Sequence, residues 1–170
     1  DNRPLRAAKG HLYEGGIRVP LFIKWPGHIT AGSVSDENVI SMDFFPTLLD
    51  AAGIRHRRSV LDGVSLLRHV TRGQPLRRDA IYFHYPNYAW HSGNRLGGAV
   101  RSGNYKLIKR YADDSLELYN LKDDLSESTN LAMEQPAITA NLSKKLDRWL
   151  TATDANMPIH PSTQQGSSEE

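Results

Sequence analysis

The sequence predicts an α/β fold, which for this chain alone is α+β. We expect the last part of an α/β domain, followed by a small antiparallel sheet of about four strands packed by a C-terminal helix. Three observations predict this: an apolar run at 19–25, four strand-like segments between 80 and 121, and an amphipathic helical pattern at 136–152. The predicted domains are 1–75 for the α/β remnant, 76–156 for the sheet and helix, and 157–170 for a flexible tail.

In the first half of the chain, residues 1–16 show no periodicity and are predicted to form a loop. The run at 19–25 is apolar on both faces, which is typical of a strand buried inside a sheet. A short amphipathic helix should follow, because Asp43 suits an N-cap, Pro46 suits the first turn and Gly53 suits the C-terminal stop. A short apolar segment at 65–70 ends at Gly73.

In the second half, strands are predicted at 80–85, 99–101, 105–111 and 116–121, with residues 102–104 as a hairpin turn. The segment at 116–121 alternates with period two, so we expect one of its faces to pack and the other to be wet. The helix predicted at 136–152 carries a single apolar stripe. The residues of that stripe are Ile138, Leu142, Leu146, Trp149 and Leu150.

The composition excludes several classes of protein. The 170 residues carry 21 basic and 19 acidic side chains, a net charge of +2, which argues against a dedicated nucleic-acid binder. No apolar run approaches the roughly 20 residues that a membrane span requires. The chain has no cysteine, so it holds no disulfide, thiolate metal site or cysteine nucleophile. We therefore expect neither a nucleic acid nor a membrane as a partner.

The charge is unevenly distributed along the chain. Residues 1–110 carry 17 basic and 8 acidic side chains, whereas residues 111–170 carry 4 and 11. The basic portion suits an anionic ligand, although solvated surface charge would give the same pattern.

The opening loop is the most informative stretch, because Lys9 and the pair Gly15-Gly16 precede the predicted buried strand. Open α/β proteins bind ligands at the ends of their strands. A lysine there offers three donors to a sulfate or phosphate oxygen. The glycine pair permits a positive φ or a close approach of two backbones.

The stretch NRPLRAAKGHLYEGGIRVPLFIKWPGHI, residues 2–29, resembles the second signature of the sulfatases. These are formylglycine-dependent sulfate ester hydrolases of the alkaline phosphatase superfamily. Later segments resemble successive parts of the C-terminal portion of arylsulfatase-type enzymes, in the expected order: ISMDFFPTLLDAAGI, LDGVSL, IYFHYPNY, AVRSGNYKLIKRY and LELYNLKDDLSESTNLA. The resemblance implies that the first half closes an alkaline-phosphatase-like α/β domain.

By this resemblance Lys9 matches the active-site lysine that contacts the substrate sulfate. It is expected to stabilise charge on the sulfuryl oxygens and the leaving group. Other residues of the same motif are expected to hold the turn and the strand, with a candidate ion pair between Glu14 and Arg18. These motif residues are Tyr13, Glu14, Gly15, Gly16 and Arg18.

Two histidines are candidate substrate contacts. His84 lies on a predicted strand that approaches the substrate pocket in similar enzymes, and His11 follows Lys9 closely. Packing of His84 among aromatic residues, and solvent exposure of His11, are the alternatives. In the nearby loop, Tyr88, Trp90 and His91 could stack on a ring substrate or simply pack at the surface.

Parts of the catalytic apparatus implied by the resemblance are missing from this sequence. The full-length enzyme is expected to use calcium and formylglycine. The sequence has no Cys, and no Ser begins a Cys/Ser-x-Pro-x-Arg segment, while Asp1-Asn2 lies too near Lys9 to match the family's metal pair. No metal ligand is assigned, and the chain alone is predicted to be inactive.

The expected partners are a sulfate ester, aryl or carbohydrate, and the N-terminal remainder of a sulfatase domain. The family implies a periplasmic or secreted location, although residues 1–10 show no signal segment. Two alternatives stay open: a non-catalytic module that binds sulfated glycans, and a phosphoesterase relative within the superfamily.

Overall fold

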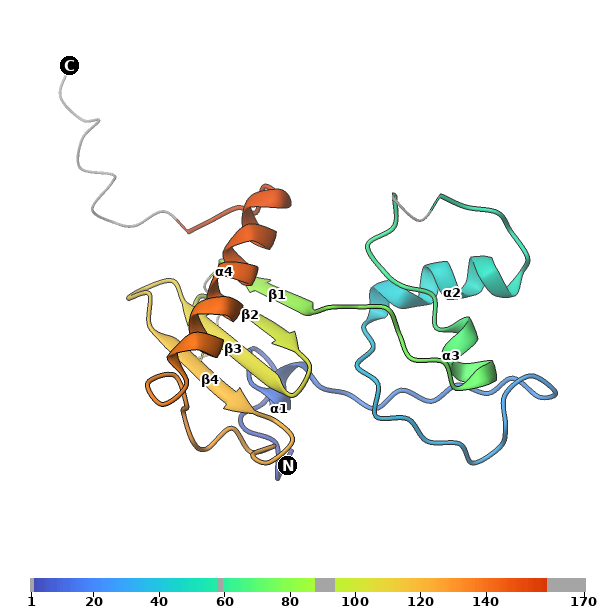
Figure 1. The fold of residues 1–170 in the computed structure, drawn as a ribbon, viewed down its shortest axis with the longest axis horizontal. Coiled ribbons are helices and arrows are strands. Elements are labelled where there is room, and N and C mark those ends of the chain that lie inside the picture. The colour runs from blue at the N-terminus through green and yellow to red at the C-terminus, as the bar shows by residue number, and fades with distance from the viewer. Residues whose placement is uncertain (1, 58–59, 88–93, 159–170) are drawn as a thin grey trace, which may run out of the picture. The chain divides into compact units, whose positions relative to one another are not determined.

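A computed structural model describes residues 2–57, 60–87 and 94–158 and contains two compact units (Figure 1). The sheet unit comprises residues up to 19 and from 82 onwards, and the helical unit comprises residues 20–81. The contacts thus group the first 19 residues with the sheet. The assignment of residues 1–75 to a larger α/β domain stays a prediction, and most of the expected tail lies outside the described residues.

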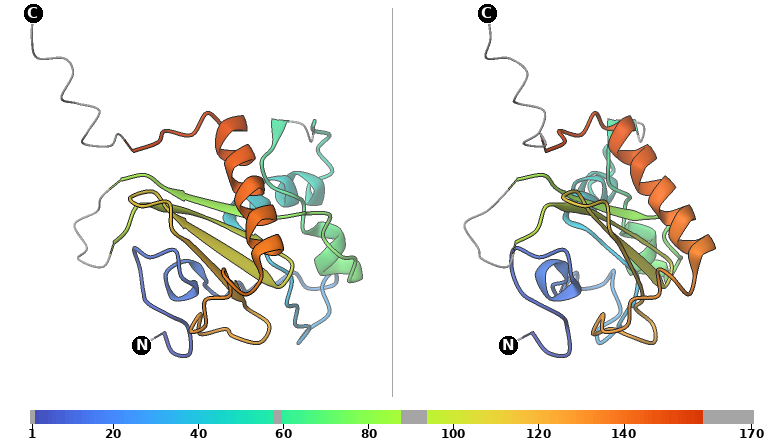
Figure 2. Two further views of the ribbon diagram at one scale, coloured as in Figure 1. Left: turned by 60° about the vertical axis from the view of Figure 1, so that its left-hand side comes forward. Right: turned by 90° about the vertical axis from the view of Figure 1, so that its left-hand side faces the viewer.

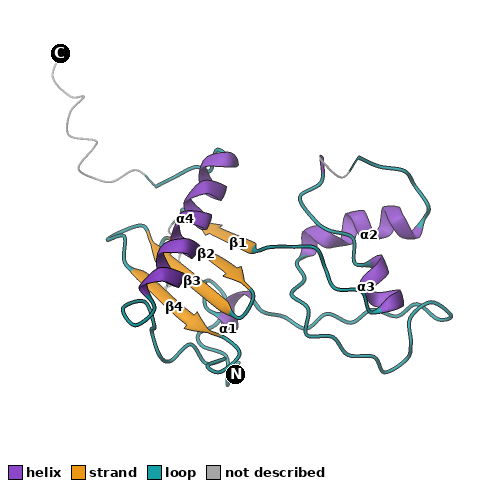
Figure 3. Ribbon diagram, in the orientation of Figure 1, coloured by secondary structure: helices purple, strands orange, loops and turns teal. Residues whose placement is uncertain are grey.

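The sheet has four strands in the order β1-β2-β3-β4, which confirms the predicted architecture (Figure 3). The antiparallel hairpin of β2 and β3 pairs Ser102 with Tyr105, so Gly103 and Asn104 form a two-residue turn. Gly103 has a φ of 56°, which glycine adopts without a steric penalty. The strands are β1 (Ile81–Tyr85), β2 (Gly97–Ser102), β3 (Tyr105–Arg110) and β4 (Leu116–Asn120).

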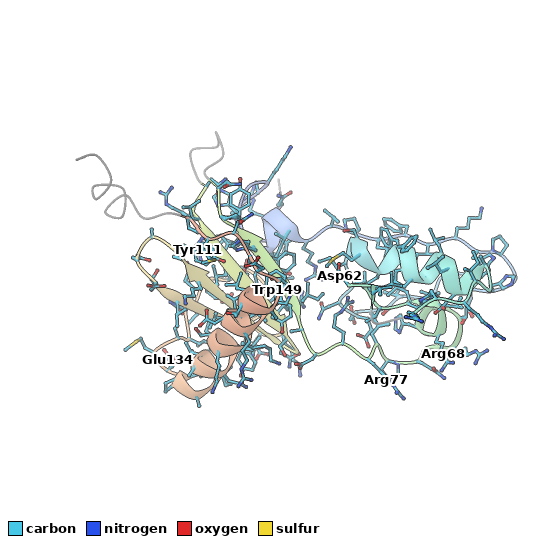
Figure 4. The ribbon with its side chains drawn as sticks, turned by 90° about the horizontal axis from the view of Figure 1, so that it is seen from above. Asp62, Arg68, Arg77, Tyr111, Glu134 and Trp149 are labelled. Carbon is cyan, nitrogen blue, oxygen red and sulfur yellow. The ribbon has the colours of Figure 1, made fainter. Side chains whose placement is uncertain are left out.

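One face of the sheet packs against α4 (Pro136–Ala152), whose bounds match the prediction. Leu142, Leu146 and Leu150 are buried, as the apolar stripe predicts. Trp149, labelled on α4 in Figure 4, stacks on Tyr82, and the ring centroids of the two side chains are 4.9 Å apart. A Cβ atom on Gly98 would meet the Leu146 side chain, which places α4 directly over β2. Within the described residues, no helix is both long and apolar enough to cross a bilayer.

The other face of the sheet is covered by the N-terminal segment 2–18. Leu12 belongs to the same core cluster as Ala99, Ile108 and Tyr119. Figure 2 shows the segment and its short helix on the side of the sheet away from α4. The prediction of a wet face on the last strand is therefore wrong, because a segment about 100 residues earlier in the chain covers it.

The helical unit contains the 3-10 turn η1 (Ser41–Asp43), α2 (Phe44–Ala51) and α3 (Leu67–Arg72). Asp43 precedes α2 as predicted, but its carboxylate does not cap that helix. It is fully buried and accepts hydrogen bonds from the backbone of Ile40 and Val64 and from Arg78. Gly53, with a φ of 69°, follows α2 as the expected stop.

The predicted strand at 19–25 is not formed. These residues have no regular secondary structure and pair with no strand among the described residues, and Val19 and Phe22 are 80% and 89% exposed. A segment that is apolar on both faces needs neighbouring strands and two covering layers. The described residues provide neither for this segment.

Candidate functional site

The segment expected to carry the site consists of turns followed by α1 (Glu14–Ile17), a four-residue helix where the sequence predicts a loop. Lys9 lies in the Lys9 loop, defined here as residues 6–11, and its side chain is exposed. No hydrogen bond or ion pair joins its ammonium group to the described part of the chain.

Gly15 and Gly16 allow α1 to lie in backbone contact with the Lys9 loop. A Cβ atom on Gly16 would lie 2.7 Å from the Ala8 carbonyl oxygen and closer still to that of His11. A Cβ atom on Gly15 would collide with the carbonyl oxygens of Arg6 and Ala7. Because the obstacles are backbone atoms on both sides of Lys9, the glycine pair determines the path of the loop.

Hydrogen bonds hold this close approach in place. The Gly15 amide donates to the Arg6 carbonyl oxygen at 2.9 Å, and the His11 amide donates to that of Ala8 at 3.2 Å. The Asn2 side-chain amide donates to the Gly15 carbonyl oxygen at 2.9 Å. The loop is therefore tied to α1 at its start and turns back on itself around Lys9.

Beneath α1 lies a buried cluster of charges. The Lys106 ammonium, fully buried on β3, contacts Glu14 at 3.0 Å and Glu127 at 2.8 Å. Arg101 on β2 contacts Glu14 at 3.2 Å, and Arg18 lies 3.7 Å from the same carboxylate, which is the predicted Glu14–Arg18 pair. Burial raises the pKa of Glu127, although the positive charge of Lys106 opposes this shift.

A second cluster anchors Tyr13. The Glu117 carboxylate accepts hydrogen bonds from Tyr13 at 2.7 Å, Tyr119 at 2.6 Å and Arg110 at 2.8 Å. Burial opposes ionisation of Glu117, but these hydrogen bonds outweigh it and lower its pKa. The Arg6 guanidinium lies 3.9 Å from the centre of the Tyr13 ring and donates to the Tyr119 hydroxyl at 3.0 Å. The start of the Lys9 loop is therefore fixed to β4.

His84 and His11, the two candidate substrate contacts, lie in different surroundings. The ring nitrogens of His84 lie 2.7 Å from the Tyr111 hydroxyl and 2.9 Å from the Asn156 carbonyl oxygen. Since the carbonyl only accepts, Nε2 carries a proton. The half-buried His11 stacks on Tyr13 beside Lys9. Substrate contact by either histidine stays a prediction, and the aromatic loop of Tyr88, Trp90 and His91 lies outside the described residues.

The described residues do not fit a calcium site. They contain no group of three or more His, Asp or Glu side chains arranged to hold a metal ion, and the Asn2 amide donates to two backbone carbonyl oxygens. An open groove of about 760 Å³ in the sheet unit runs along α4, and Lys9 does not line it. The calcium and formylglycine of the full-length enzyme therefore stay expectations.

Four residues that support the motif from the sheet and from the loop after β4 were not predicted from the sequence: Arg101, Lys106, Glu117 and Glu127. One signal was available, because Lys106 interrupts the apolar segment Tyr105-Lys106-Leu107-Ile108, where a strand interior rarely admits an unpaired charge. The partners of Lys106 could not be found in this way.

The chain matches the family model described as "N-sulphoglucosamine sulphohydrolase, C-terminal" over residues 7–155. A sulfatase of Formosa agariphila is 36% identical over 91% of the chain and 31% of that protein. The N-acetylglucosamine-6-O-sulfatase of Bacteroides thetaiotaomicron is 39% identical over 72% of the chain and 23% of the relative. Human arylsulfatase A is 34% identical over 82% of the chain and 27% of the enzyme.

Solved structures show the same similarity. Ps i-CgsB, in complex with k-i-k-neocarrahexaose, has a TM-score of 0.74 and 26% identity over 88% of this chain and 32% of that one. A protein in complex with its substrate D-glucosamine-2-N,6-O-disulfate has a TM-score of 0.67 and 29% identity, covering 79% and 28%. The chain spans less than a third of the length of each of these relatives.

Proposed function

Since the chain belongs to the sulfatase family, whose C-terminal part it matches, we propose that it completes a sulfate ester hydrolase and supplies Lys9 as the cation that contacts the substrate sulfate. A lysine ammonium is a compact charge with three donors, suited to oxygens on which negative charge develops in the transition state. The fixed path of the Lys9 loop against Gly15 and Gly16 carries this proposal. A preorganised cation stabilises the transition state without reorganising when the reaction occurs.

The exposed apolar surface of the helical unit supports a longer enzyme. Phe22 is 89% exposed, and α2 exposes Phe45 and Leu48. Exposed apolar surface of this kind marks a region that another element covers. We propose that the remainder of the sulfatase domain covers it and provides the strands that would flank residues 19–25.

The nucleophile and the metal site would also come from that remainder. The chain has no cysteine to become formylglycine, and its described residues do not fit calcium. The chain alone should therefore lack sulfatase activity, and turnover of an aryl sulfate by this polypeptide in the presence of calcium would contradict this expectation. The periplasmic or secreted location stays a prediction.

The substrate class proposed is a sulfated carbohydrate or an aryl sulfate. The curated relatives include an N-acetylglucosamine-6-O-sulfatase and an arylsulfatase A, and a related structure holds a disulfated glucosamine as its substrate. These ligands share the sulfate ester, the group that Lys9 would contact.

The test is the substitution Lys9→Ala in the full-length sulfatase, with Lys122→Ala as a matched control on another exposed loop of the same unit. Loss of one donor to developing charge should lower kcat for 4-nitrophenyl sulfate by roughly 10²- to 10³-fold. The control should change kcat less than about twofold. Wild-type kcat in Lys9→Ala would disprove the role of Lys9.

The same preparation separates the two alternatives. A preference for 4-nitrophenyl phosphate over the sulfate would indicate a phosphoesterase. Saturable binding of a sulfated disaccharide that depends on Lys9, without turnover by the full-length protein, would indicate a binding module.

A further inference from the structure

Glu127 lies in the loop after β4 and contacts α1, which is more than 100 residues earlier in the chain. Its carboxylate accepts a hydrogen bond from the Glu14 amide at 2.6 Å, at the first residue of α1. Its own carbonyl oxygen accepts one from the Arg6 guanidinium at 2.8 Å, at the start of the Lys9 loop. Glu127 therefore contacts α1 through its carboxylate and the Arg6 side chain, at the start of the Lys9 loop, through its own carbonyl oxygen.

The loop after β4 is built to present Glu127. Glu127 has a φ of 52°, a left-handed conformation that costs a non-glycine residue about 1–2 kcal/mol. Asp124 holds this turn, since its carboxylate accepts hydrogen bonds from the backbone of Ser128 and Thr129 and from the hydroxyls of Ser126 and Ser128. The turn thus compensates for an unfavourable conformation at this one residue.

The environment of Glu127 holds its carboxylate in one place. Both Glu127 and Lys106 are fully buried, and Lys106 lies between the carboxylates of Glu127 and Glu14. Arg101 and the more exposed Arg18 add positive charge beside Glu14, so the two buried carboxylates face Lys106 and two arginines. Removing one member of such a cluster leaves a buried charge without compensation.

We propose that Glu127 is a positioning residue for Lys9, acting through the Glu14 amide of α1 and the Arg6 end of the Lys9 loop. This inference rests on the proposed function, because it concerns the placement of the sulfate-contacting lysine. Lys9 makes no bond of its own within the described residues, so its position depends on the backbone that Glu127 supports. Small displacements of a catalytic group have large effects on rate.

The test is a double-mutant cycle in the full-length sulfatase. Glu127→Asp keeps the charge beside Lys106 but shortens the side chain by one methylene, withdrawing it from the Glu14 amide. We expect kcat for 4-nitrophenyl sulfate to fall roughly 10- to 100-fold with little change in KM. In a Lys9→Ala background the same substitution should lower kcat less than about twofold, because the group it positions is already absent.

Two further variants complete the cycle. Glu127→Gln keeps the length of the side chain and an acceptor oxygen for the Glu14 amide, but it removes the charge that faces Lys106. It should therefore lower the unfolding midpoint, while the folded protein retains most of the wild-type kcat. Glu134→Asp is the matched control, since Glu134 is exposed on a turn before α4 (Figure 4), and it should leave kcat unchanged.

The outcomes are distinguishable. If the fold-loss of kcat in the double variant equals the product of the losses in Glu127→Asp and Lys9→Ala, then Glu127 supports only the fold. That result would overturn the inference. If Glu127→Asp does not fold, Arg6→Met removes the other contact, between the Arg6 guanidinium and the Glu127 carbonyl oxygen. A loss of kcat that disappears in the Lys9→Ala background then supports the inference, and a loss that persists fully in that background overturns it. Wild-type kcat in Lys9→Ala would instead remove the proposed function itself.

Discussion

The substitution Gly16→Ala tests most directly whether α1 determines the position of Lys9. In an ordinary helix this change would stabilise the protein, because glycine loses more backbone entropy on folding than alanine does. Here the new Cβ atom would lie 2.7 Å from the Ala8 carbonyl oxygen, whereas ordinary contact begins at 3.4 Å. The Lys9 loop would have to move by at least about 0.7 Å, and by more at His11, whose carbonyl oxygen is closer.

A displacement of this size has two measurable consequences. Overpacking against backbone atoms typically costs about 1–3 kcal/mol of stability. A misplacement of a catalytic group by about 1 Å can lower the rate about 100-fold, so we expect kcat to fall roughly 10- to 100-fold. The assay is hydrolysis of 4-nitrophenyl sulfate by the full-length sulfatase, together with its thermal unfolding midpoint.

The matched control is Gly73→Asn. Gly73 ends α3 in the left-handed conformation with no atom near its missing Cβ, and asparagine tolerates this conformation. It should leave kcat unchanged. A Gly16→Ala variant with the wild-type kcat and midpoint would refute the reasoning, since it would mean that the loop can yield without moving Lys9.

Two further predictions concern the sheet unit. Leu146→Ala should lower the free energy of unfolding by about 2–5 kcal/mol, because Leu146 is fully buried between α4 and the sheet; Met133→Ala, at a side chain 92% exposed, should change it by less than about 0.5 kcal/mol in the same denaturant titration, and equal effects would contradict the packing described. Partial burial opposes ionisation of Asp124, but hydrogen bonds from Thr129 and Ser128 outweigh it and lower its pKa from 3.8 to about 2. The unfolded chain therefore binds more protons in this range, so stability should fall as the pH drops from about 4 to 2. Asp124→Asn should flatten that slope, and an unchanged slope in unfolding midpoints measured between pH 2 and 5 would show that Asp124 is not its source.

Local patterns predicted the elements whose stability is local. The 3.6-residue apolar period of residues 136–152 predicts both the bounds of the helix and its buried stripe. The β2–β3 hairpin follows from one turn between two strands. Gly53 and Gly73 stop their helices because of their own conformational freedom. In each case the information lies within a few residues of the feature it predicts.

The wrong predictions concern features that a local pattern does not determine. The apolar run at 19–25 was predicted to be a buried strand, but a strand exists only with partners, and the described residues supply none. The face of β4 predicted to be wet is covered by the N-terminal segment. The helix α1 has only four residues, too few for a periodic signal.

The sequence by itself determined the family of this protein and the residue to propose for sulfate contact, because a contiguous motif records the chemistry that a loop must present. It could not reveal that Lys106 and Arg101 on the sheet, and Glu127 in the loop after β4, hold this motif. Only the tertiary structure decided that, since a hydrogen bond between positions 14 and 127 depends on how strands and loops distant in the chain are brought together. The buried charges that support α1 stabilise it only when the fold brings their partners within about 3 Å of one another.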